Sequence, residues 1–215
     1  MMRKIVLIYL ICIGFAQSFT SRFFVPIYLT MSASSGYDHN FLKFSEDEML
    51  DAETDTWLLG QSTSLHSYGL KESFSLLYIP YIMKDHETQF RFKVNNTSYF
   101  ASSDKSYRSY SFRLLQHVGT YQWIKFSYKF IPYFYIKEYT DRDIQMYEPE
   151  NGTFSPDIAF YAASFSQETM TATYTHPILL HRTWLSINYI FKKQYYNIHF
   201  TEFDLDINEF SFGFN

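Results

Sequence analysis

Residues 121–137 form a run so regular that it limits what the whole chain can fold into. One side of the run carries Ile124, Phe126, Tyr128, Phe130, Pro132, Phe134 and Ile136. The other side carries Trp123, Lys125, Ser127, Lys129, Ile131, Tyr133 and Lys137. Because a strand points successive side chains to opposite faces, the run predicts a strand with one apolar face and one lysine-bearing face. It is longer than the usual globular strand of about five or six residues. Such a length and pattern are what a membrane-spanning β-barrel requires.

The composition favours strands and excludes a helical membrane protein. The chain of 215 residues has 23 Phe and 20 Tyr, and these residue types are enriched in strands. Mean hydropathy is -0.22, and nothing after Ser18 approaches the roughly 18 consecutive apolar residues of a membrane-spanning helix. With 18 basic against 22 acidic residues, the chain lacks the basic excess typical of nucleic-acid binding.

The N-terminus predicts a secretory signal peptide over residues 1–18. Arg3 and Lys4 precede the short apolar run Ile5–Phe15, and Ala16-Gln17-Ser18 supplies a cleavage site flanked by small residues. Removal of this segment leaves a mature chain of residues 19–215 and takes away Cys12, the sole cysteine. The mature protein then has no disulfide, no cysteine zinc site and no thiol nucleophile. The absence of disulfides in an exported protein of this size favours a bacterial source.

Seven further segments show strand-like patterns, so about eight strands are expected. They are Arg22–Ser34, Ser73–Met83, Gln89–Asn95, Arg108–Gln116, Thr183–Phe191, and parts of 157–176 and 203–214. Connections are long after the first, third, fifth and seventh strands and short after the others, which is the rhythm of an up-and-down barrel. In the last strand the apolar positions change phase near Asn208, which predicts a bulge or two short strands.

The chain ends in the alternating aromatic sequence Phe210-Ser211-Phe212-Gly213-Phe214. With the signal peptide, the strands and the loop rhythm, Arg22–Asn215 resembles the bacterial outer-membrane β-barrel proteins. The resemblance implies an all-β, antiparallel up-and-down transmembrane β-barrel in the bacterial outer membrane. It also implies two partners, the lipid bilayer and the assembly machinery that recognises a C-terminal aromatic strand. Asn215 follows the last Phe, which leaves open that the chain is one segment of a larger barrel.

The barrel hypothesis assigns a direction to each face. The residues predicted to face lipid are Ile124, Phe126, Tyr128, Phe130 and Phe134. The charged residues predicted to face the lumen are Arg91, Lys93, Arg113, Lys125, Lys129, Asp204 and Asp206. Because unpaired buried charges are costly, these groups form either a salt-bridged polar core or an anion-selective lumen.

No catalytic pattern is present, so we expect no enzyme, no metal and no cofactor. The sequence has no Gly-x-Ser-x-Gly, His-Glu-x-x-His, P-loop or Gly-x-Gly-x-x-Gly. The acidic stretches 46–55 and 141–143 lack the spacing of an EF-hand loop. The predicted role is structural, adhesive or passive porin-like transport. The alternative is a secreted soluble barrel, similar to a lipocalin, with the apolar face turned inward around a ligand. The sequence carries no signal for the oligomeric state.

Overall fold

The computed structural model describes residues 23–54, 59–60, 62–83, 86–141, 146–148, 153–155, 159–178 and 183–214. The predicted signal peptide, the loop residues Arg142 and Asp143, and Asn215 therefore lie outside the described residues. The main strands are β1 (Ile27–Asp38), β2 (Ser67–Tyr78), β3 (Thr88–Tyr99), β4 (Tyr107–Gly119), β5 (Gln122–Asp141), β8 (Ala159–Ile178), β9 (Thr183–Tyr196) and β10 (Leu205–Phe214). The smaller elements are α2 (Glu46–Thr54), β6 (Met146–Glu148), β7 (Thr153–Ser155) and a 3-10 turn at Thr201–Phe203.

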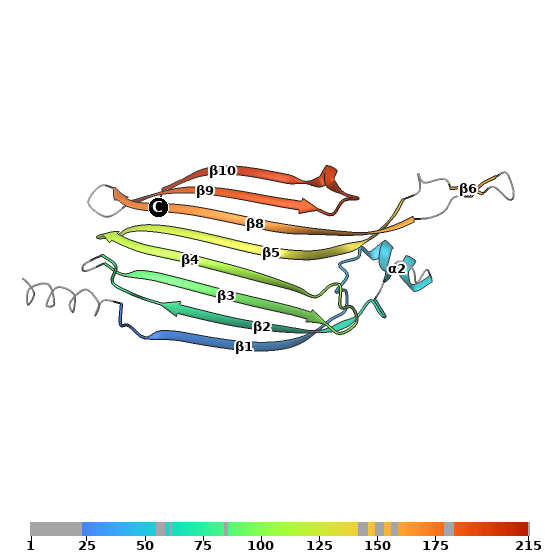
Figure 1. The fold of residues 1–215 in the computed structure, drawn as a ribbon, viewed down its shortest axis with the longest axis horizontal. Helices are drawn as coiled ribbons and strands as arrows, with labels where there is room; N and C mark the ends of the chain where they lie inside the picture. The colour runs from blue at the N-terminus through green and yellow to red at the C-terminus, as the bar shows by residue number, and fades with distance from the viewer. Residues whose placement is uncertain are drawn as a thin grey trace, which may run out of the picture.

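The eight long strands form one antiparallel sheet in the order β1-β2-β3-β4-β5-β8-β9-β10, so strand neighbours follow the order of the chain (Figure 1). The predicted all-β class, up-and-down order and number of main strands are therefore confirmed. The two-stranded β6-β7 hairpin, between β5 and β8, and the helix α2 were not predicted.

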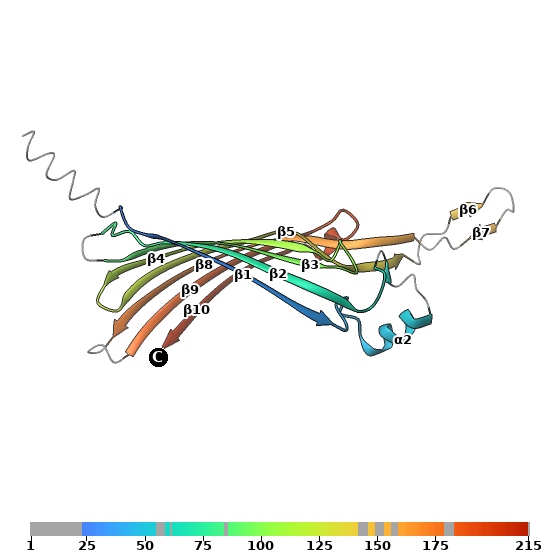
Figure 2. The ribbon, with the colours of Figure 1, turned by 90° about the horizontal axis from the view of Figure 1, so that it is seen from below.

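The sheet is open, which differs from the closed barrel expected from the sequence. Within the described residues, β1 pairs only with β2 and β10 pairs only with β9. Figure 2 shows a twisted sheet in which β1 and β10 form the two edges. Almost every residue of these two strands is exposed. The structure therefore leaves two long edge strands with unpaired backbone groups, which in a folded protein attract further strands.

Strand pairing keeps apolar residues in register on one face, which we call the apolar face. Directly paired residues lie on the same side of a sheet. One row across all eight strands is Ile27, Tyr78, Phe90, Leu114, Phe126, Ala172, Tyr189 and Phe210. The next row is Leu29, Leu76, Phe92, Phe112, Tyr128, Met170, Phe191 and Asn208. The opposite side, which carries Lys129, we call the cationic face.

The first of two bulges in β5 moves Phe134 away from the apolar face. The register against β8 shifts between Ile131 and Phe134 and again between Tyr135 and Lys137. Pro132 lies in the first of these intervals, and proline has no N–H to donate to the ladder. After this shift Phe134 pairs with Phe165, whose neighbours on the cationic face include Gln167. The strict alternation expected through residues 121–137 therefore holds only as far as Ile131.

The last strand contains no bulge. β10 pairs with β9 in one unbroken register from Leu205 to Phe214. As a consequence, Ile207 lies beside Lys192 on the cationic face, whereas Phe210 and Phe212 lie on the apolar face. The change of phase in the sequence therefore reflects a strand that presents apolar side chains first to one face and then to the other.

The segment after β1 folds into a small cap (residues 39–54) with its own hydrophobic core, beside one end of the sheet (Figures 1 and 2). Phe41, Leu42, Phe44 and Ala52 are buried together. Helix α2 within it begins with a capping box: the Glu48 N–H donates to Ser45 Oγ at 3.2 Å, and the Ser45 N–H donates to Glu48 Oε2 at 2.9 Å. The cap is thus stabilised by its buried hydrophobic cluster and by the capping box at the N-terminus of α2.

We predict that Phe41→Ala loosens the cap and leaves the sheet intact. Phe41 is 2% exposed and its ring centroid lies 5.2 Å from that of Tyr99 on β3, so it attaches the cap to the sheet. Truncation of a buried Phe to Ala costs about 3–5 kcal/mol. Hydrogen exchange should therefore become faster in α2 while β3 and β4 stay protected. The control is Leu50→Ala, since Leu50 belongs to the same cap, on α2, and is 64% exposed. Equal effects of the two substitutions would contradict the packing described.

Candidate functional site

The cationic face brings together basic residues from three neighbouring strands. Arg91 on β3 lies directly opposite Arg113 on β4, and Arg113 in turn pairs with Ser127 on β5. In the next row, Lys93 and Lys129 flank Ser111. The structure therefore places four of the predicted lumen-facing charges in two adjacent rows.

These residues line a groove of about 460 Å³, which we call the cationic groove. Its residues are Arg91, Lys93, Asn95, Ser109, Ser111, Phe112, Arg113, Ser127, Tyr128, Lys129, Thr169 and Thr171. No acidic side chain is among them. Within the described part of the chain, the ion pairs are Lys43–Asp38, Lys137–Glu48 and Lys193–Asp206, so none of the four groove cations is paired. The surrounding hydroxyl and amide groups give the groove hydrogen-bonding capacity without negative charge.

The two predicted lumen aspartates are not brought to this groove. Asp206 pairs in register with Lys193, and their charged groups lie 3.8 Å apart. In the register, Lys193 continues the row of Phe130 and Glu168, so both ions are on the apolar side of the sheet. Asp204 precedes β10 and accepts a hydrogen bond from the Tyr196 N–H at 2.6 Å. Asp206 lies on this side because the β10 register is unbroken, so the first half of β10 presents each side chain to the face opposite to the one predicted.

Lys125 and Lys192 extend the cationic face beyond the groove. Lys125 pairs with Leu115 and Thr173, one row toward the short β4–β5 turn. Lys192 pairs with Thr169 and so continues the row of Lys129. Lys192 was not among the residues predicted to face the lumen, because the strand was expected to end at Phe191. Continuing the alternation through Tyr196, where β9 ends, finds it.

Four of the five residues predicted to face lipid lie together on the apolar face. Ile124, Phe126, Tyr128 and Phe130 follow one another at alternate positions of β5, before its first bulge. Phe126 is 36% exposed and Ile124 is 46% exposed, so the described chain covers both side chains only in part. Phe134 instead contacts the rings of Tyr107 and Phe165, with centroid distances of 5.0 and 5.1 Å.

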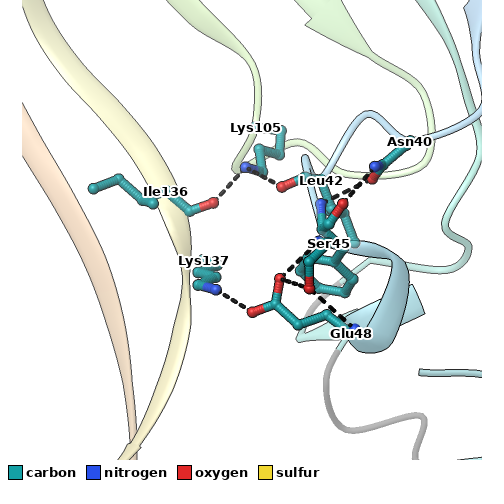
Figure 3. A network of polar contacts seen from close by, with 8 residues as sticks. Asn40, Leu42, Ser45, Glu48, Lys105, Ile136 and Lys137 are labelled. Carbon is teal, nitrogen blue, oxygen red and sulfur yellow. Dashed lines mark hydrogen bonds and ion pairs between the residues drawn. The ribbon is translucent and has the colours of Figure 1, made fainter. Parts of the chain in front are cut away.

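At the end of the sheet that carries the cap, Lys105 ties the cap to β5 (Figure 3). Its Nζ donates to the backbone oxygen of Ile136 on β5 and to that of Leu42 in the cap, the latter at 3.5 Å. Nζ also lies 5.3 Å from the centroid of the Tyr135 ring. Nearby, Lys137 on β5 forms an ion pair with Glu48 of α2 (Figure 3). Two lysines therefore hold the cap against the end of β5.

Burial changes the proton affinity of Lys105. The residue is 8% exposed, and desolvation, followed by the nearby charges of Lys137 and Lys43, lowers its pKa to about 8. Because the ordinary value is 10.5, the unfolded chain binds more protons at this lysine between these two pH values. The contribution of this group to the free energy of unfolding therefore rises as the pH increases through that window.

The contribution of the Glu48 carboxyl to stability also rises with pH, but it does so in the acid range. Its hydrogen bonds with Lys137 and with the Ser45 N–H lower its pKa below the ordinary value of 4.5. A lowered carboxyl pKa stabilises the folded form above the unfolded pKa, and this stabilisation is lost as the pH falls through the folded value. The cap attachment is thus weakened by acid at Glu48.

Two further features concern the described residues, a metal site and a membrane-spanning helix. There, no three His, Cys, Asp or Glu side chains are grouped closely enough to hold a metal ion. Within the same residues, no helix combines the length and apolar character needed to cross a membrane.

Comparison with known proteins returns no relative. No protein-family model, no curated protein sequence and no solved structure matches this chain. Any functional conclusion must therefore come from the two faces of the sheet and from the cap.

We predict that the Lys105 ammonium titrates near pH 8. In protein with ¹³C-labelled lysine, the ε-carbon signal that disappears in Lys105→Met should move with a midpoint about 2 units below that of an ordinary lysine. The urea midpoint of the wild type should also rise between about pH 7.5 and about pH 9.5, and it should rise less in Lys105→Met. A midpoint at the ordinary lysine value would contradict the burial of this group.

Proposed function

We propose that the chain forms the wall of an outer-membrane β-barrel, with the apolar face against lipid and the cationic face toward the lumen. The observation that carries the proposal is that no residue of the two apolar rows is buried in the described structure. The buried hydrophobic residues there are Phe41, Leu42, Phe44, Ala52, Ile131, Tyr135 and Ala163. None of them belongs to the two apolar rows that cross all eight strands. A continuous apolar surface of this extent is stable when a membrane or a partner covers it.

The apolar face has a limited height on β5. It comprises the four alternate positions Ile124, Phe126, Tyr128 and Phe130. Seven residues of extended chain span about 23 Å along the strand, which is about 17 Å of height at the strand tilt of about 40° found in outer-membrane barrels. The apolar band of such barrels is about 25 Å tall. These four positions therefore account for about two thirds of the height of that band.

Polar residues bound the apolar face on the side of the cap. On β2 to β4 the row Glu72, Asn96 and Arg108 follows the apolar rows, and Asn96 Nδ2 donates to Glu72 Oε2 at 3.0 Å. On β8 to β10 the corresponding boundary consists of Glu168, Lys193 and Asp206. Charged side chains are costly inside hydrocarbon and cheap at its surface. The two sets support a water boundary at this end of the sheet.

The proposed activity is passive rather than catalytic. A small barrel has a side-chain-filled interior, and its loops carry adhesive or structural contacts. The alternation of a lipid face and a polar face also suits a porin-like wall of a wider barrel. Either form requires the β1 and β10 edges to be joined, to each other or to the edges of further copies, because open edges do not occur in hydrocarbon.

A soluble barrel similar to a lipocalin is the second candidate. In that arrangement the apolar face turns inward and surrounds an apolar ligand, and the cationic face meets water. Strand alternation is the same in both arrangements. The exposure of Arg91, Arg113 and Lys129 on the open sheet is the observation that favours it. The two candidates differ in what Phe126 contacts, and this difference can be measured.

Spin labels placed on neighbouring residues of β5 test the assignment of faces. Cys12→Ser supplies a cysteine-free chain, into which Phe126→Cys, Tyr128→Cys, Ser127→Cys and Lys129→Cys are introduced singly. In lipid vesicles we predict that labels at 126 and 128 collide mainly with oxygen, which concentrates in hydrocarbon. Labels at 127 and 129 should collide mainly with a water-soluble nickel chelate.

The same labels give a distinct result for the soluble barrel. The chain would then stay out of the vesicle fraction, and a label at 126 would be shielded from both reagents. This outcome, or equal nickel access at 126 and 129, would overturn the membrane proposal.

Cysteine pairs across the two sheet edges test how the sheet is completed. One cysteine is placed at Met31 of β1 and its partner is scanned along β10 from Asn208 to Phe214. A disulfide forms where the two Cα atoms come within about 7 Å. We predict intrachain crosslinks at alternate positions for a barrel closed by one copy, and crosslinked dimers for a barrel of several copies. If neither product forms at any position in membranes, the edges remain open and the barrel proposal fails.

A further inference from the structure

We infer that the cationic groove binds a multivalent oxyanion, of the phosphate or polyphosphate class. This inference goes beyond the proposed barrel and does not depend on it, since the groove exists on one face of the sheet wherever the protein is located. It concerns Arg91, Arg113, Lys93 and Lys129, which the proposed function uses only as polar lining.

Two arginines lie directly opposite each other in the groove. Arg91 and Arg113 are cross-strand partners in the β3–β4 ladder. Like charges placed directly opposite each other destabilise a strand pair. In the described structure neither guanidinium has an ion-pair partner. An anion bound between them would convert this repulsion into attraction, because a guanidinium offers paired donors that match phosphate oxygens.

The row of the arginine pair holds no acidic group close to it. On the cationic face, the row of Arg91 and Arg113 continues through Ser127, Thr171 and Ile190 to Glu209 on β10. β10 is four strands from β4 in the sheet order. At about 4.8 Å per strand, this separation is about 19 Å along the sheet. Such a distance exceeds a Debye length at physiological salt, about 8 Å, so Glu209 does not neutralise the groove.

The size and the chemistry of the groove also suit a multivalent oxyanion. A volume of about 460 Å³ lies within the range of small-molecule sites. The second row adds Lys93 and Lys129 on either side of the Ser111 hydroxyl. Thr169, beside Lys129, already accepts a hydrogen bond at its Oγ1 from Gln167 Nε2 at 3.2 Å, so its hydroxyl proton is left to donate. Two arginines, two lysines and donor hydroxyls suit an anion with several charged oxygens rather than chloride.

Calorimetric titration of the purified full-length chain with pyrophosphate tests the inference. The measurement is made in a neutral detergent, and sodium chloride at the same ionic strength serves as the reference titration. We expect saturable binding of pyrophosphate to the wild type and none of chloride. Arg91→Gln and Arg113→Gln should each weaken pyrophosphate binding by about tenfold or more, as expected for loss of a charge-assisted hydrogen bond.

Arg108→Gln provides the matched control. Arg108 is on the same strand as Arg113 but pairs with Asn96 on the opposite face, and it is exposed. The Arg108→Gln substitution removes the same charge as Arg113→Gln. It should change the affinity for pyrophosphate by less than about twofold, as surface substitutions away from a site do. If Arg108→Gln weakens binding as much as Arg113→Gln, the anion responds to overall charge and the site does not exist. Absence of saturable pyrophosphate binding to the wild type has the same meaning.

Thermal unfolding supplies a second readout that separates binding from damage to the fold. Without ligand, Arg113→Gln relieves the arginine repulsion, so its melting temperature should equal or exceed that of the wild type. With saturating pyrophosphate the order should reverse, because only the wild type gains the full stabilisation of a bound ligand. A variant that melts lower than the wild type under both conditions, by the same margin, would indicate a structural role for Arg113 and overturn its assignment to an anion site.

Discussion

The antiparallel ladder is the constraint on which the rest of the structure depends. Each strand alternates on its own, but only the register between strands places Phe126 beside Ala172 and Lys129 beside Thr169. A slip of one residue in any pair would exchange the two faces of that strand. Because the register is unbroken between the bulge at the start of β5 and the bulge that follows Ile131, both an apolar face and a cationic face extend across the sheet.

The cap and the edges show where the ladder alone does not decide the structure. The cap adds a hydrophobic core and is held to β5 by Lys105 and Lys137. It lies at the sheet end where the apolar face gives way to Glu72 and Arg108. The edges have no such contacts in the described chain. The same sheet thus has one protected end and two unprotected sides, and this asymmetry is what a wall that is completed by further pairing requires.

Much of the fold could be predicted from the alternation, and the errors have local causes. Pro132 interrupts the β5 ladder and turns Phe134 to the cationic face. The β10 strand runs straight through its change of phase, which separates Asp206 from the arginines. The spacing of Ser45 and Glu48 is a capping-box signal from which α2 could have been found. The predicted faces of Phe134 and Asp206 were wrong because the pairing with the neighbouring strand, rather than the alternation within the strand, fixed the direction of these side chains.

By itself, the sequence determined the all-β class, the order of the strands and the segregation of apolar from cationic side chains, because these follow from a period of two residues within each strand. Only the tertiary structure decided which charges are neighbours. It places Arg91 opposite Arg113 and extends the row of Lys129 to Lys192. It also places Asp206 on the face opposite to these cations. It also left the sheet open. The physical reason is that register depends on hydrogen bonds between neighbouring strands, and closure on hydrogen bonds between the first strand and the last, and the alternation within one strand specifies neither.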